Sequence, residues 1–361
     1  MVRKALDLVY ARLERNKRLG MLKPVVEAAD GFFYGTSHRT GSAPHIVDHL
    51  DIKRFMFAVV IALIPALAAS VYFYGWRVVY LIALSYMAGG ACEVAFAVFR
   101  KKEIEEGFLI TGLIFPLTLP PTVPAWVVVA GIVFGVIFGK EVFGGTGRNI
   151  FNPALVGRVF VTISFPRIMT ISWFEPLTGG IAGFGRFAPD AVTSATPLML
   201  FKSDGIIVSL RDLFLGLAPG SIGETFSLGI LLGGLFLIIM KIASWRIPLT
   251  YLLSVAVFSL IGNAFRPELF APPVFQLLSG GLLFGAFFMA TDPVTSPFTN
   301  TGRLIAGVIL GLLTVIIRTF SGFVEGVMFA ILLMNAFTPL IDHMVVEKRY
   351  RVTGEKNGGK G

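Results

Sequence analysis

One hydroxyl-rich run contains side chains that could take part in chemistry, Asp190-Ala-Val-Thr193-Ser194-Ala195-Thr196-Pro197. The run lies in a long loop of mixed polarity between two blocks of apolar segments. Taken alone, such a run favours a loop or a helix cap, because serine and threonine hydroxyls bond readily to nearby backbone groups. Whether it has a function therefore depends on the segments around it.

Acidic side chains in or beside apolar segments form a second group of candidates. An unpaired ionisable group inside a membrane costs about 3 kcal/mol on insertion scales, so it is expected to be functional or paired. Carboxylate oxygens suit small hard cations, and the alternative is ion pairing or hydration at the membrane surface. Both interpretations stay open for Glu141, Asp292 and Asp342, and pairing is favoured for Glu325. The basic residues considered as partners are Lys140, Arg148, Arg158 and Arg303.

The composition is that of a membrane protein. Of the 361 residues, 55% are hydrophobic and 15% are charged, with a mean hydropathy of +0.78, whereas a soluble protein carries roughly 25% charged residues. The long charged N-terminus lacks the apolar core and cleavage site of a signal peptide. The net charge of +9 collects in loops and tails, so nucleic-acid binding is not expected.

Ten apolar segments predict an all-α polytopic fold, because several approach the ~20 residues that a helix needs to cross a bilayer. They cover 55–74, 78–99, 108–119, 124–138, 153–165, 227–242, 248–265, 276–290, 304–317 and 322–341. Lys and Arg in the short loops favour cytoplasmic positions for both termini. The loop that contains Thr196 would then lie outside the cytoplasm.

These segments divide the chain into five regions. Residues 1–50 combine a basic amphipathic helix, expected over 2–23, with a connector. Residues 51–165 and 227–343 form two membrane halves, joined by the external loop 166–226. The basic, glycine-rich tail 344–361 is expected to be loose.

The two halves resemble each other weakly. The motif Asn149-Ile-Phe-Asn-Pro153 is echoed by Asn335-Ala-Phe-Thr-Pro339, and Gly112–Phe115 by Gly281–Phe284. An odd number of spans in each half predicts inverted repeats, with short or interrupted segments at the binding site; the alternative is chance recurrence. The glycine-rich stretch 143–149 lacks the context of a nucleotide fingerprint, so it is interpreted as non-helical backbone that leads into a short segment.

Metal and cluster chemistry find little support. The single cysteine, Cys92, cannot form an internal disulfide, and an iron–sulfur cluster needs about four ligands. The four histidines are scattered, and the pair His45 and His49 follows Pro44 with no helix evident. No metal site is predicted.

Six stretches taken together resemble the B subunit of the sodium-translocating NADH:quinone reductase and its sister, the D subunit of the Rnf electron-transport complex. They are 139–160, 190–197, 219–224, 243–247, 287–300 and 325–343, and the resemblance covers roughly 25–350. The extended N-terminus, with Phe32-Phe-Tyr-Gly35 and 45–54, favours the reductase, because the Rnf protein begins closer to its first span. The fold implied is similar to that of urea channels.

The resemblance implies that FMN is attached through a phosphoester to the last threonine of a D-x-x-S-[GT]-A-T motif, by a separate flavin transferase that uses FAD. Here the acceptor is Thr196, within a motif formed by Asp190, Thr193, Ser194 and Ala195. Two positions depart from the pattern: Thr193 replaces serine, and Ser194 replaces glycine or threonine. Both changes keep the site small or hydroxylic and bear on the efficiency of the transferase.

The resemblance also implies a non-covalent riboflavin and the reduction of a quinone, coupled to Na⁺ movement. Candidate residues for this region are Gly144, Gly145, Asn149 and Pro153, because a flavin needs backbone donors and flat apolar walls. Glu141, Asp292 and Asp342 match family acids associated with sodium uptake. The chain would then act as one component of a redox complex in the bacterial inner membrane, inactive alone.

Two alternatives stay open. The D subunit of an Rnf complex keeps the flavin and changes the electron donor. A channel or transporter without redox function shares the expected topology, since fold does not fix function. The attachment motif separates this alternative from the others, because a transporter has no need of it.

Overall fold

The computed structural model describes residues 52–101, 107–177 and 194–358. The predicted N-terminal amphipathic helix and connector lie outside the described residues, as do Asp190 and Thr193 of the attachment motif. Within the described ranges every regular element is a helix. The all-α prediction is therefore confirmed for this part of the chain.

Six helices are long and apolar enough to cross a membrane. They belong to α3 (Ile52–Tyr74), α4 (Trp76–Arg100), α6 (Ala125–Gly139), α12 (Arg246–Phe265), α15 (Asn300–Phe320) and α16 (Val327–Gly358). Shorter apolar helices are α5 (Phe108–Leu117), α7 (Pro153–Ser164) and α11 (Ser227–Ile239). The chain is thus a multi-pass membrane protein, and the count of ten crossings stays a prediction.

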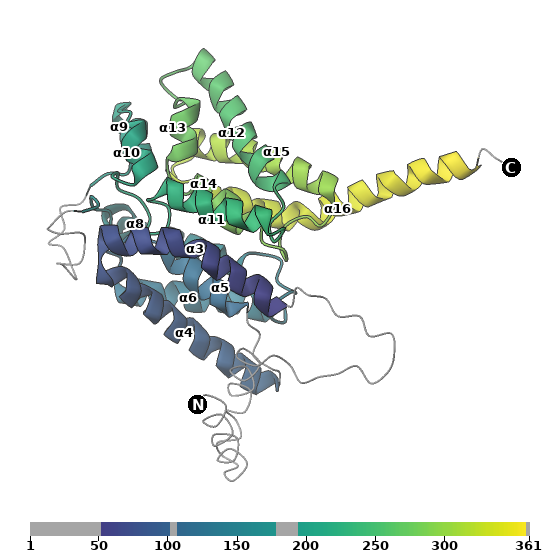
Figure 1. Ribbon diagram of the computed structural model, residues 1–361, viewed down its shortest axis with the longest axis horizontal. Coiled ribbons are helices and arrows are strands. Elements are labelled where there is room, and N and C mark those ends of the chain that lie inside the picture. The colour runs from purple at the N-terminus through teal and green to yellow at the C-terminus, as the bar shows by residue number, and fades with distance from the viewer. Residues whose placement is uncertain (1–51, 102–106, 178–193, 359–361) are drawn as a thin grey trace, which may run out of the picture.

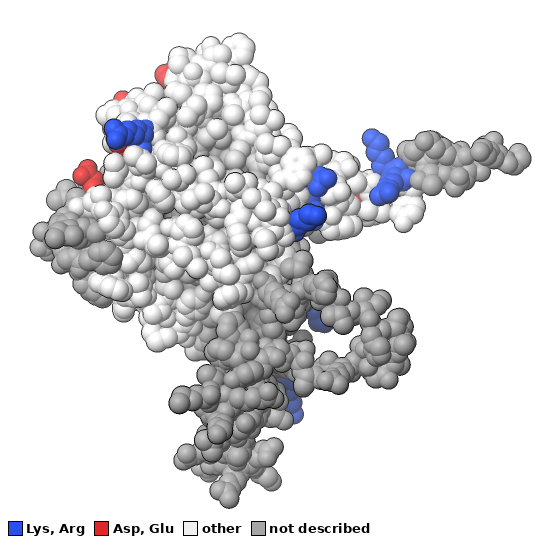
Figure 2. Space-filling view, in the orientation of Figure 1, with Lys and Arg blue, Asp and Glu red and all other residues white. Residues whose placement is uncertain are grey.

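The surface agrees with this assignment. In the view of Figure 2, charged side chains gather over the end that carries α9 (Pro197–Asp204) and α10 (Leu210–Leu215), and over the end where α16 leaves the body. The described surface between these ends is nearly free of charge in this view. Leucine, isoleucine and phenylalanine side chains are exposed along α11 and α12, as lipid contact requires.

The helices pack in the same order in both halves. Helix α4 contacts α6, and α6 contacts α7; correspondingly, α12 contacts α15, and α15 contacts α16. The first helices of the two halves, α3 and α11, pack against each other, and one apolar core runs through both halves. The two echoed motifs also meet, because the Asn152 N–H donates to Asn335 Oδ1 over 3.2 Å. This order is what an internal repeat predicts.

Glycine allows helices α6 and α7 to approach closely. A Cβ atom built at Gly135 would lie 2.5 Å from the Pro153 carbonyl oxygen, and one at Gly157 would lie 2.5 Å from the Gly131 carbonyl oxygen. In the second half, Gly307 and Gly311 of α15 lie equally close to α12. Small residues at such contacts are the usual means of helix packing in membranes.

Two predicted boundaries are wrong. The segment 276–290 is not continuous: α13 (Pro273–Leu278) ends before Gly280, whose φ of +63° is left-handed, and α14 (Leu282–Phe284) passes into a π-turn over Gly285–Met289. The last helix does not end near residue 343, because α16 continues to Gly358 and projects from the body (Figure 1). Its charged residues are good helix formers, so the helix has no local reason to stop where the apolar pattern does.

Candidate functional site

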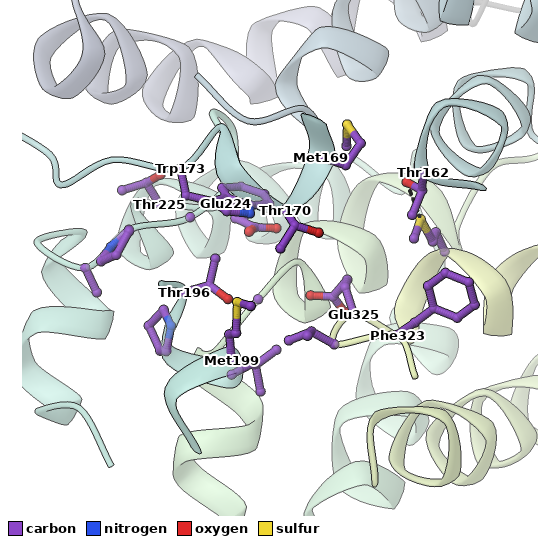
Figure 3. Close-up of a pocket in the computed structure, with 18 of the residues that line it drawn as sticks. Thr162, Met169, Thr170, Trp173, Thr196, Met199, Glu224, Thr225, Phe323 and Glu325 are labelled. Atoms are coloured by element: carbon purple, nitrogen blue, oxygen red, sulfur yellow. Dashed lines mark hydrogen bonds between the residues drawn. The ribbon is translucent and has the colours of Figure 1, made fainter. Parts of the chain in front are cut away.

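A cavity of about 240 Å³ opens beside the hydroxyl-rich run (Figure 3). Its walls come from α7, from α8 (Pro166–Ile171), from the start of α9, from the turn before α11 and from the loop before α16. Thr196 lines it, and Figure 3 shows Glu224 and Glu325 across the same space. The loop 166–226 is thus partly helical and forms a wall of a cavity.

Thr196 is the N-cap residue of α9. Its backbone is extended, at φ −67° and ψ 153°, and its carbonyl oxygen accepts the Leu200 N–H over 2.9 Å. Pro197 follows at the first helical position, which suits proline because that position needs no N–H donor. The Thr196 hydroxyl makes no capping hydrogen bond. It is therefore left available for another bond.

The other described residues of the motif hold Thr196 in place. The Ser194 N–H donates to the Trp173 carbonyl oxygen over 3.0 Å, which ties the run to the segment after α8. The Ser194 hydroxyl is buried and has no hydrogen-bond partner in the described part of the chain. Ala195 is half-buried between them. The described residues 194–196 thus form a short loop that ends at the N-cap of α9, and Thr196 lines the cavity without a capping bond.

Glu224 reaches the cavity through a turn that folds back into the protein. The N–H groups of Ile222 and Gly223 donate to the carbonyl oxygens of Leu119 and Leu117, over 3.1 and 2.7 Å. The Glu224 carboxylate accepts the Ser221 N–H over 2.7 Å. This carboxylate was not predicted as a site residue, although its stretch, 219–224, carries part of the family resemblance.

Glu325 ties together three elements around the same cavity. Its carboxylate pairs with Arg318 of α15 over 3.0 Å, and accepts the Gly281 N–H at the start of α14 over 2.9 Å and the Val327 N–H at the start of α16 over 3.3 Å. The interpretation of Glu325 as a paired acid is confirmed. Its partner, Arg318, was not among the bases considered, and Glu325 lies in the loop before α16 rather than within the tenth segment.

Glu224 should make the stability of the protein depend on pH. Burial in the cavity wall raises the pKa of Glu224, and the nearby charge of Glu325 adds to the effect. The folded state then holds a proton that the unfolded state has lost, so stability falls as pH rises from the ordinary carboxyl pKa of 4.5 to the higher folded pKa.

The Glu224→Gln variant removes this titration and keeps an oxygen for the Ser221 N–H. Thermal unfolding in detergent, followed across pH, should show wild type losing stability relative to the variant as pH rises through that window. Glu175→Gln, a change in the loop outside the cavity lining, provides the control. Parallel pH curves for wild type and Glu224→Gln would contradict the prediction.

A second cavity, of about 70 Å³, is lined by two residues predicted for the riboflavin and quinone region and by one acid predicted for sodium uptake. Asn149, Pro153 and Asp292 all line it, together with Lys140 and the aromatic rings of Phe287 and Phe288. Gly144 and Gly145 do not line it. Their φ angles of 114° and 107° instead shape the non-helical loop that leads into α7, as the sequence predicted.

The acids associated with sodium uptake all have partners in the structure. Glu141 pairs with Arg100 over 3.0 Å, and Lys140 pairs with Glu93. Asp342 lies within α16 and accepts the N–H groups of Phe298 and Thr299 over 2.9 and 3.1 Å. Asp292 accepts the Val294 N–H over 3.1 Å, and its burial raises its pKa. The structure does not bring Glu141, Asp292 and Asp342 into one cluster among the described residues.

Comparison with known protein sequences identifies the family of this chain. Residues 39–351 match the sequence model of the NQR2, RnfD, RnfE family. The chain belongs to this family. The predicted resemblance is thereby confirmed, and the match spans both membrane halves and the loop with Thr196.

Two kinds of family member resemble the chain over most of its length. The first kind is named as the B subunit of the Na⁺-translocating NADH-quinone reductase. The protein of Azotobacter vinelandii is 37% identical, and the match covers 96% of this chain and 97% of that protein. The protein of Pseudomonas aeruginosa is 36% identical, and the match covers 99% of this chain and 100% of that protein. The D subunit of the Na⁺-translocating ferredoxin:NAD⁺ oxidoreductase complex of Acetobacterium woodii is 40% identical over 88% of this chain and 97% of that protein.

Proposed function

We propose that the chain is the flavin-carrying membrane subunit of a Na⁺-translocating NADH:quinone reductase, with FMN attached to Thr196. Near full-length similarity to B subunits of that reductase supports the first part. The observation that carries the second part is the Thr196 hydroxyl, which makes no capping bond and lines a cavity large enough to take part of a cofactor.

The start of α9 suits a phosphoester. The first N–H groups of a helix have no acceptor within it, and the helix dipole adds partial positive charge there. A phosphate on the N-cap oxygen would lie beside the N–H groups of Leu198 and Met199. Helix N-termini commonly bind phosphate for these reasons. The residues present therefore fit the phosphate end of FMN.

The rest of the cavity suits an aromatic ring system. Trp173, Met169, Met328 and Phe323 supply apolar and aromatic wall, and Arg158 supplies a buried positive charge. Bound FMN would contribute electron transfer, which no side chain in the cavity can perform. The protein would contribute the covalent anchor, the orientation and the electrostatic surroundings.

The second cavity is the proposed region for riboflavin and quinone, with Asn149 and Pro153 in its wall and with Gly144 and Gly145 shaping the adjoining loop. Glu141, Asp292 and Asp342 remain proposed sites for Na⁺ passage; their present hydrogen bonds and ion pairs would have to open for this. The proposed partners are the other subunits of the complex and a flavin transferase. The proposed location is the bacterial inner membrane, with both termini cytoplasmic and Thr196 on the periplasmic side.

Sodium transport by the assembled complex tests the function. The complex purified with this chain and reconstituted in liposomes should take up ²²Na⁺ when NADH and a water-soluble quinone are added. The same complex with Thr196→Ala should not. Equal NADH-driven uptake by the two complexes would contradict the redox role of Thr196, and uptake that needs no NADH would favour a channel.

A protein of the Rnf type is the second candidate, favoured by the 40% identity to an Rnf-type D subunit. That match leaves more of this chain uncovered than the matches to reductase proteins do, which favours the reductase. The electron donor separates the two functions. Uptake driven by reduced ferredoxin in the presence of NAD⁺, and not by NADH with quinone, would establish the Rnf assignment.

A further inference from the structure

Arg158 is an unusual residue in the wall of the Thr196 cavity. Only 6% of its surface is exposed, yet its guanidinium forms no hydrogen bond or ion pair with any described residue, and its Nη1 atom is fully buried without a partner. A buried guanidinium without partners is costly, because it loses its hydration and gains nothing in return. Such a group points to an anionic ligand in the cavity.

Neighbouring charges do not satisfy Arg158. Glu224 and Glu325 act on it through space, but neither lies within ion-pair distance. Glu325 is already bound to Arg318 and to the Gly281 N–H, and Glu224 to the Ser221 N–H. The charged groups around the cavity are therefore Arg158, Glu224, Glu325 and Arg318, and of these only Arg158 lacks a direct partner in the described chain.

Arg158 lines the cavity from α7, whereas Thr196 lines it from the start of α9. Arg158 lies one turn before Thr162 on α7, and the Thr162 hydroxyl donates to the Arg158 carbonyl oxygen over 2.7 Å. Figure 3 shows Thr162 and Thr196 on opposite sides of the cavity. The phosphate end belongs at Thr196 and the start of α9. The side of the cavity formed by α7 is left for the ring.

We propose that Arg158 is the cationic partner of the flavin ring, placed to offset the negative charge that the ring gains on reduction. This inference rests on the proposed function. Two electrons from a reductant and one proton at N5 leave one negative charge on the N1–C2=O edge, and a second proton would neutralise it. A fixed guanidinium favours the charged form, as any opposite charge at close range does. Arg158 would thereby raise the reduction potential of the flavin and lower the pH at which the reduced ring takes up its second proton.

The test uses the full chain, produced with a flavin transferase and reduced with dithionite beside a reference dye of known potential, while the absorbances of flavin and dye are recorded. Arg158→Met should lower the two-electron equilibrium constant for reduction at least tenfold, which is about 30 mV. The pH at which the reduced form takes up its second proton should rise by about one unit, again a tenfold change. Arg158→Lys, which keeps the charge, should stay close to wild type.

Three outcomes would overturn the role of Arg158. The first is a flavin-loaded Arg158→Met chain with the potential and protonation pH of wild type. The second is a flavin-loaded Arg158→Gln chain with the wild-type potential and protonation pH; this variant replaces Arg158→Met if the methionine variant does not fold. The third is failure of both neutral variants to fold while Arg158→Lys folds, because the charge would then serve the protein itself. A wild-type chain without covalent flavin would instead refute the proposed function.

Discussion

Replacing Thr196 with alanine should abolish covalent flavin attachment, while leaving the protein folded. The phosphoester requires a hydroxyl oxygen at the N-cap of α9, and no other hydroxyl among the described residues combines that position with the cavity. Loss of the cap costs little here, because the Thr196 side chain makes no capping hydrogen bond in the first place. A typical N-cap threonine contributes about 1 kcal/mol, so the variant should stay well above its unfolding threshold.

Fluorescence on a denaturing gel measures the effect directly. The chain co-expressed with a flavin transferase should give a band that fluoresces under ultraviolet light, and Thr196→Ala should give a dark band of equal protein content. Thr196→Ser, which keeps a hydroxyl, should recover part of the signal. The control is Ser203→Ala, which removes an exposed hydroxyl of α9 that lies outside the attachment motif and does not line the cavity. A fluorescent alanine variant would place the flavin on another residue.

Replacing Gly135 with alanine should destabilise the packing of the first half more than most single changes. The added Cβ would lie 2.5 Å from the Pro153 carbonyl oxygen and 3.0 Å from the Gly157 nitrogen. Both are backbone atoms, so no side-chain rotation can relieve the contact. Overpacking of this kind typically costs about 1–3 kcal/mol, and α7 must shift away from α6.

Gly90→Ala provides a matched control on α4. A Cβ at Gly90 would meet only the Phe108 ring, at 3.4 Å, and alanine favours a helix over glycine by about 1 kcal/mol. Melting in detergent, followed by size-exclusion chromatography of heated samples, should show a lower midpoint for Gly135→Ala and an unchanged or higher midpoint for Gly90→Ala. Equal midpoints would show that α6 and α7 are not tightly packed in the protein.

Local sequence patterns predicted most of the helices and the nature of the breaks between them. The apolar segments coincide with helices because lipid leaves the backbone few alternatives to hydrogen bonding within the helix. The glycine loop at 143–149 was predicted as non-helical, since glycine adopts the positive φ angles found there at no steric cost. The break at Gly280 was not predicted, because the residues on both sides are apolar and nothing in the pattern marks a single left-handed residue.

The sequence predicted some residues of the candidate site and missed others. Thr196 followed from its motif, but Glu224 lies 28 positions away on a turn that is fixed by bonds to Leu117 and Leu119. Arg158 was considered only as a partner for acids, and its lack of a partner is a property of packing. In the same way, Glu141 pairs with Arg100 and Glu325 with Arg318, two arginines that no local spacing rule singles out. Contacts across the sequence decide these pairings.

Helix α7 contributes to both cavities. Pro153 and Ala154 line the smaller one, and Arg158 and Thr162 line the larger. At 1.5 Å per residue, Ala154 and Thr162 are about 12 Å apart along the axis. Two cofactors bound in these cavities would therefore be held at a fixed separation by one helix, α7. Since electron tunnelling depends steeply on distance, the length of α7 between the two cavities would bear on the rate of transfer between the two cofactors.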